Sequence, residues 1–72
     1  MIKKNKIKIR LNGKIHYLHA NSSIGDLLKT LKIKLNKVAI EINREIIDKN
    51  KINKIKIKNK DIIEIVHFIG GG

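Results

Sequence analysis

The chain has 72 residues and no cysteine, so the sequence predicts one small domain and excludes a disulfide framework, a cysteine-ligated metal and a thiol nucleophile. Its formal net charge of +11 raises the question of a nucleic-acid partner. The basic residues are lysines except for Arg10 and Arg44, and the aromatic residues are Tyr17 and Phe68. These are too few for bidentate base contacts or a stacking platform. We therefore expect weak attraction to acidic partners and no specific nucleic-acid binding.

The sequence holds no run of about 18 apolar residues, so we expect neither a transmembrane helix nor a membrane partner. The first five residues are basic and lead into alternating residues, which is not typical of a signal peptide. Isoleucine, lysine and asparagine dominate the composition, as an AT-rich coding sequence favours. We expect a cytoplasmic protein, or one of the plastid stroma if the gene is carried by the organelle.

A β-hairpin is predicted near the start of the chain. Residues 6–11 alternate polar and apolar side chains, which is typical of a half-buried strand with Ile7, Ile9 and Leu11 facing inward. Asn12-Gly13 is the strongest short hairpin signal, because both turn positions need positive φ. Residues 14–19 return as the second strand, and we expect Ile15 and Tyr17 to face inward, while the pattern leaves the direction of Leu18 open.

Two histidines of the second strand raise the question of a metal site. His16 and His19 are three residues apart, so on a regular strand they point to opposite faces. That arrangement makes a poor metal pair, and we expect exposed histidines and no metal.

A helix is predicted after the hairpin. Ser23 fits the N-cap position, and Asp26 lies three residues later, where a capping box places its acidic partner. The following apolar residues recur at helical spacing and form one stripe toward the core. The stripe consists of Ile24, Leu27, Leu28, Leu31 and Leu35.

The second half of the chain predicts further short strands. Residues 38–43 alternate, with Val38, Ile40 and Ile42 on one face. Residues 43–45 predict a turn, and 46–47 form a short apolar return. Residues 48–53 are polar and predict a loop or a short helical turn. Residues 54–58 alternate again, and we expect a short strand there.

The last strand has apolar residues on both faces. Ile63 and Ile65 share one face, while Ile62, Val66 and Phe68 share the other. If the first pair enters the core, the other three form an exposed apolar patch, which usually marks a partner surface. The alternative is that a loop or an edge of the sheet covers them.

The order of elements predicts an α+β fold, in which one helix packs on one face of a mixed sheet of four to five strands. The first and last strands then lie side by side and parallel, the arrangement of a β-grasp. We expect this domain to span residues 1–69 and a flexible glycine tail to span 70–72.

The tail itself suggests a chemical role. Residues 69–72, fully extended, reach about 13–14 Å beyond the strand. Glycines have no Cβ, so Gly70, Gly71 and Gly72 can pass through a narrow channel and leave the terminal carbonyl open to attack. A frayed end without function is the alternative reading.

Four stretches of the chain resemble the ThiS family, the ubiquitin-like sulfur carriers of thiamine biosynthesis, and together they span nearly the whole chain. One departure is Lys60, where many relatives carry glycine before the aspartate, and it concerns turn geometry. The absence of proline before the glycines favours this branch over the small subunit of molybdopterin synthase. The four stretches are residues 11–14, 23–28, 38–47 and 60–72.

The resemblance implies a ubiquitin-like β-grasp and a carrier that is not itself an enzyme and binds no cofactor. In the family, a ThiF-type adenylyltransferase uses MgATP to adenylate the last glycine, here Gly72. A cysteine-derived persulfide then converts it into a thiocarboxylate, which gives its sulfur to a ThiG-type thiazole synthase. We expect Ile62, Val66 and Phe68 to dock these partners. The alternatives are a sulfur carrier for molybdopterin or tRNA thiolation, a protein modifier joined to lysines, and a basic nucleic-acid-binding module.

Overall fold

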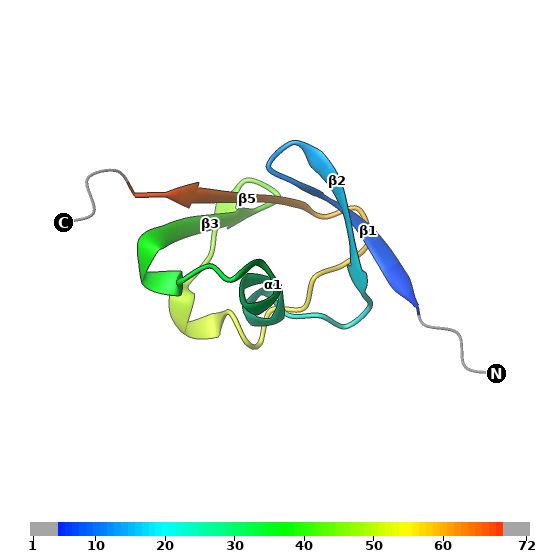
Figure 1. Cartoon of the computed structure of the whole chain (residues 1–72), viewed down its shortest axis with the longest axis horizontal. Helices are drawn as coiled ribbons and strands as arrows, with labels where there is room; N and C mark the ends of the chain where they lie inside the picture. The colour runs from blue at the N-terminus through cyan, green and yellow to red at the C-terminus, as the bar shows by residue number, and fades with distance from the viewer. Residues whose placement is uncertain (1–4, 69–72) are drawn as a thin grey trace.

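A computed structural model describes residues 5–68 of the chain. In this range one helix packs on one face of a five-stranded mixed sheet of order β2-β1-β5-β3-β4 (Figure 1). The predicted α+β fold with parallel first and last strands is therefore confirmed. The elements are β1 (Lys6–Leu11), β2 (Lys14–His19), α1 (Ile24–Leu31), η1 (Leu35–Lys37), β3 (Val38–Ile42), β4 (Glu45–Ile46), η2 (Lys49–Lys51) and β5 (Ile62–His67).

The core lies between the sheet and α1, as the alternation of the strands predicts. Ile63 is fully buried and Ile65 nearly so, and both project from β5 toward the helix. The helix contributes Ile24, Leu27 and Leu28 to the same cluster. Leu31 and Leu35 pack against it while partly buried, Leu35 from η1. One layer of helix thus covers one face of the sheet, and the other face has no covering element among residues 5–68.

The inward face of β2 differs from the prediction. Ile15 and Tyr17 point away from the core and are 52% and 61% exposed. The two-residue turn Asn12-Gly13, with φ of 49° and 82°, places His16 opposite Ile9 and Leu18 opposite Ile7. Since directly paired residues point to the same face, His16 and Leu18 lie on the core side. Turn length, not the apolar pattern, sets this register.

The predicted strand at residues 54–58 is also wrong. This segment makes one isolated bridge, between Lys56 and Ser23, and joins no strand of the sheet. The amide of Ile57 donates to Ser22 at 2.8 Å, and the amide of Ile24 donates to the carbonyl of Ile55 at 3.1 Å. The alternation reflects burial of Ile57 beside the start of α1, because the segment pairs with the loop before the helix.

No helix among the described residues is long and apolar enough to cross a membrane.

The predicted capping box at the start of α1 is confirmed. The backbone N–H of Ser23 donates to the Asp26 carboxylate at 2.9 Å, and the N–H of Asp26 donates to the Ser23 hydroxyl at 3.1 Å. The first of these bonds, with help from the Ser23 side chain, lowers the pKa of Asp26 below its ordinary value of 3.8. The ionised carboxylate therefore stabilises the first turn of the helix.

We expect Asp26→Asn to flatten the acid limb of the stability curve. A carboxyl whose pKa is lowered by folding stabilises the protein above its unfolded pKa, and this contribution is lost as pH falls through the folded pKa. The difference in unfolding free energy between wild type and Asp26→Asn should shrink as pH falls from about 5 to about 2. Urea titrations at several pH values measure it, and a difference that does not change with pH would contradict the assignment.

Candidate functional site

The candidate site is built on β5, which lies between β1 and β3 and leads into the C-terminal glycines. Antiparallel pairing with β3 runs from Ile42↔Ile63 to Val38↔His67. The next amide, of Phe68, donates to the carbonyl of Lys37 at 2.9 Å. The backbone is therefore held by the sheet as far as Phe68. The predicted tail residues Gly70, Gly71 and Gly72 lie outside the described residues.

Two turn asparagines hold the other parts of β5. The strand pairs directly with β1 only at Ile62 and Ile63. Beyond that point the side chain of Asn12 bonds the strand instead of β1. It accepts from the amide of Ile65 at 2.8 Å and donates to the carbonyl of Ile65 at 3.3 Å. At the start of the strand, Asn43 accepts from the amide of Ile62 at 2.9 Å. These side chains replace the ladder bonds that β5 lacks, and so fix the direction in which the strand leaves the sheet.

Asn12 and Asn43 were expected only as turn residues, and their contacts with β5 went unpredicted. Both have positive φ, 49° and 51°, which asparagine tolerates better than most residues. The signal that could have found them is chemical. Glycine fits any turn position that requires only positive φ. Asparagine at such a position adds a side-chain amide, which can form hydrogen bonds with the backbone of a neighbouring strand.

Exposed apolar side chains gather on the uncovered face of the sheet. Ile62 and Val66 lie on this face of β5, 45% and 54% exposed, which is one of the two outcomes that the two-sided pattern allowed. Ile15 and Tyr17 lie on it from β2, and Ile46 reaches it from β4 through its pairing with Glu41. Because no described element covers them, this face has the composition of an interaction surface.

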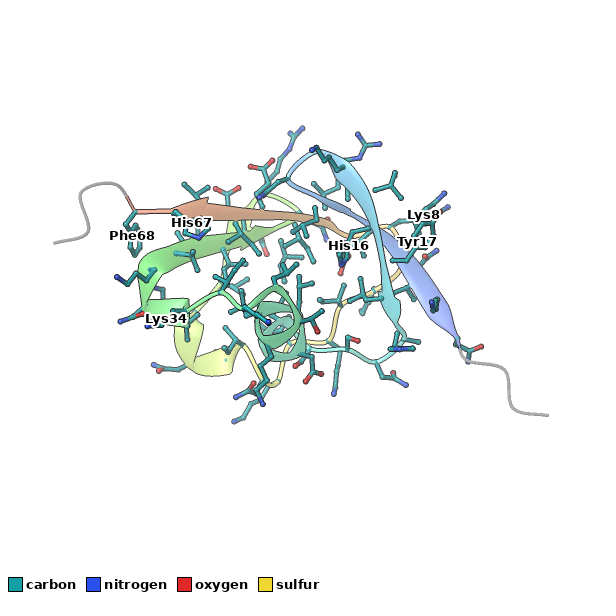
Figure 2. All side chains as sticks on the ribbon, viewed as in Figure 1. Lys8, His16, Tyr17, Lys34, His67 and Phe68 are labelled. Carbon is teal, nitrogen blue, oxygen red and sulfur yellow. The ribbon has the colours of Figure 1, made fainter. Side chains whose placement is uncertain are left out.

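Phe68 sits where β5 ends, and it is 55% exposed. The ammonium of Lys49 lies 4.9 Å from the centroid of its ring, within the range of a cation–π contact. Lys49 belongs to η2, the segment whose end bonds the start of α1 through the amide of Gly25. Ile62 and Val66 share the open sheet face, whereas Phe68 lies where β5 ends, far from Lys8 and Tyr17 (Figure 2).

The histidines do not build a metal site. His16 lies on the core side of β2 and His19 on the open side. Among residues 5–68, no group of three or more His, Asp or Glu side chains could hold a metal ion.

A comparison with protein families decides the assignment of the chain. The model of the ThiS family matches residues 9–72, which include β5 and the terminal glycines. The chain belongs to the ThiS family. Its sheet and helix are a ubiquitin-like β-grasp, as the resemblance implied.

Proteins similar to this ThiS-family chain include a sulfur carrier and a thiazole synthase. The sulfur carrier protein ThiS of Bacillus subtilis is 38% identical over 65 residues, covering 89% of this chain and 98% of that protein. A thiazole synthase of Magnetococcus marinus is 38% identical over 66 residues, covering 92% of this chain but 20% of the synthase. The crystal structure of ThiS from Geobacter metallireducens superposes with a TM-score of 0.80 at 26% identity, covering 92% of this chain and 100% of that one.

Proposed function

We propose that this chain is a sulfur carrier for thiamine biosynthesis and that Gly72 carries the sulfur on its terminal carboxylate. The observation that supports this most is the family match, which extends through the last residue of the chain. The geometry of β5 is consistent with it, because the sheet holds the backbone to Phe68 and four residues follow. The carrier then acts as a protein cosubstrate, and other enzymes supply the catalytic groups.

The chemistry begins with a carboxylate, which is a poor acyl donor because its leaving group would be oxide. A ThiF-type adenylyltransferase with MgATP converts the Gly72 carboxylate into an acyl adenylate and releases pyrophosphate. The terminal sulfur of a cysteine-derived persulfide attacks the acyl carbon, and the C–O bond to AMP breaks. A thiolate then attacks the other sulfur of the resulting acyl disulfide, which leaves a thiocarboxylate on Gly72 and a disulfide on the donor side. This thiocarboxylate is the sulfur nucleophile for a thiazole synthase.

The partner enzymes are assigned by chemistry and by similarity. A domain similar to this chain makes up a fifth of the Magnetococcus marinus protein named thiazole synthase, which supports a ThiG-type synthase as partner. We assign Ile62, Val66 and Phe68 to partner docking, since they are exposed and lie closest along the chain to the tail. We place the reaction in the cytoplasm, or in the plastid stroma if the gene is organellar.

Intact mass spectrometry tests the proposal. The chain is incubated with a ThiF-type enzyme, MgATP and a persulfide donor, and omission of ATP is the control. A mass gain of one oxygen-to-sulfur exchange is the expected result. Protein conjugates of higher mass in cells would instead identify a modifier. Capture by the large subunit of molybdopterin synthase in preference to thiazole synthase would place the carrier in another pathway.

We expect Phe68→Asp to weaken binding to the adenylyltransferase by roughly tenfold or more, because exposed aromatic residues are frequent hot spots of protein interfaces. The thermal midpoint should change little, since the ring is half exposed and does not belong to the buried core cluster. Phe68→Leu, which keeps an apolar side chain, is the matched control and should bind with smaller loss. Titration calorimetry gives the affinities, and equal affinities for Phe68→Asp and wild type would remove Phe68 from the interface.

A further inference from the structure

A hollow lies on the open face of the sheet, over β1 and the start of β5. Three cations surround it, and aliphatic side chains form the rest of its lining. The residues that line it are Lys8, Ile9, Arg10, Ile15, Lys60 and Ile62.

The register of the sheet explains why these groups meet. Arg10 pairs with Ile15 on β2 and with Ile62 on β5, so the guanidinium stands in one row between two isoleucines. Both isoleucines are about half exposed, at 52% and 45%. Directly paired side chains stand about 5 Å apart, so one bound segment can contact all three. The hollow therefore presents two apolar side chains and a cation to the same ligand.

Lys60 adds a cation to this hollow at a conformational cost. Its amide donates to the carbonyl of Lys8 at 2.7 Å, which fixes the turn against β1. Its φ is +74°, a region in which glycine is unstrained and other L-residues are disfavoured. The side chain of Lys60 thus brings positive charge to a backbone position that glycine would fit better.

The hollow is separate from the end of β5. Ile62 and Phe68 are six residues apart on an extended strand, which corresponds to roughly 20 Å. Figure 2 shows Lys8 and Tyr17 at one end of the long axis and His67 and Phe68 at the other. A ligand in the hollow therefore does not cover the end of β5.

The β3 half of the open face carries the opposite charge. Glu41 and Glu64 pair directly across β3 and β5, where like charges destabilise a sheet. The neighbouring side chains on this face are uncharged, namely Ala39, Asn43, Ile46, Ile62 and Val66. An acidic ligand is thus attracted to the β1 half of the face and repelled from the β3 half. A nucleic acid running along the face would meet this glutamate pair and one tyrosine, which disfavours it.

We propose that this hollow docks an acidic segment of a partner protein, with aliphatic side chains packed on Ile15 and Ile62, on either side of Arg10, and carboxylates on Lys8, Arg10 and Lys60. This contact adds a partner-binding site to the proposed function. It rests on that function in one respect, because it requires that the chain works by binding partner proteins. It would hold the carrier to its partner about 20 Å from the end of β5, the strand that leads into the C-terminal residues.

Amide NMR of the isotope-labelled chain tests the site with a short peptide that alternates leucine and glutamate as the probe. The amides of Lys8, Arg10, Ile15 and Ile62 are expected to shift, whereas those of β3 and β4 are not. A peptide that alternates serine and glutamate should bind more weakly, because it keeps the charge and lacks the aliphatic anchor. Equal binding of the two peptides, or a shift map centred elsewhere, would overturn the proposal.

A charge-matched pair of variants separates the site from the general positive charge. The double variant Lys8→Gln/Arg10→Gln should bind the leucine–glutamate peptide about fivefold more weakly or worse, since it loses two charge contacts. Lys34→Gln/Lys54→Gln removes the same charge from exposed positions in the helix layer and should weaken binding by less than about twofold. Equal losses would overturn the proposal, as would tighter binding of a single-stranded oligonucleotide at the same residues. No step requires sulfur loading, so failure here and failure of the carrier chemistry are distinguishable.

Discussion

Deleting Gly72, or adding one residue after it, should abolish sulfur loading. Adenylation requires a carboxylate at the end of the last glycine, positioned at the ATP phosphates of the partner enzyme. Deletion shortens the reach by roughly 3.5 Å, and extension moves the reacting carbon by the same distance past its place. Misplacement on the order of 1 Å costs about 10²-fold in rate, so both changes should reduce loading below detection.

Intact mass after incubation with the adenylyltransferase, MgATP and persulfide donor measures the effect. The unfolding midpoint of both variants should stay close to that of wild type, because the core residues and the ladder pairs of the described part of the chain lie at or before His67. Adding one residue before Met1 is the control for a change in length, and it should leave loading unchanged. Loading that survives at Gly71, or on the added residue, would exclude a mechanism specific to the Gly72 carboxylate.

The parts of the fold that follow from local chemistry could be predicted from the sequence. Asn12-Gly13 forms the expected tight turn, and Ser23 with Asp26 forms the expected capping box, because each depends on residues within four positions. The burial of Ile63 and Ile65 on one face of β5 follows from alternation once the helix covers a single face. Lys60, whose departure from the family pattern concerned turn geometry, lies in a turn and has a φ of +74°.

The errors lie where the apolar pattern is ambiguous. Ile15 and Tyr17 on one face compete with Leu18 on the other, and counting apolar residues favours the wrong face. Pairing through the two-residue turn would have given the correct one, because Ile9 is in the core and His16 stands opposite it. Residues 54–58 alternate like a strand, but alternation reports burial on one side and does not say which segment supplies the hydrogen bonds.

The candidate site could also be predicted from the sequence only in part. Exposure of Ile62 and Val66 was one of two readings of a strand with apolar residues on both faces, and the structure decides it. Their role in docking stays a prediction, as do the tail mechanism and the partners. The contacts of Asn12 and Asn43 with β5 needed the tertiary structure, since they join residues 53 and 19 positions apart.

The second large effect concerns stability, and we expect Ile63→Ala to remove a large part of it. Ile63 is fully buried beneath α1 and next to β1, so truncation loses apolar contacts and leaves a cavity. Changes of this kind cost about 2–5 kcal/mol. A domain of this size has roughly 4–11 kcal/mol of stability, by proportion to chain length. The variant should therefore be marginally folded, with sulfur loading reduced in proportion to the folded fraction.

Ile62→Ala is the matched control, because it makes the same chemical change one position earlier on the same strand. Its side chain is 45% exposed on the open face, so we expect a loss of about 1 kcal/mol or less. Guanidinium titrations of the two variants give the free energies, and the m-value shows whether unfolding remains cooperative. If Ile62→Ala cost as much as Ile63→Ala, the open face would be packed against something in solution, and the docking surface proposed for it would not be free.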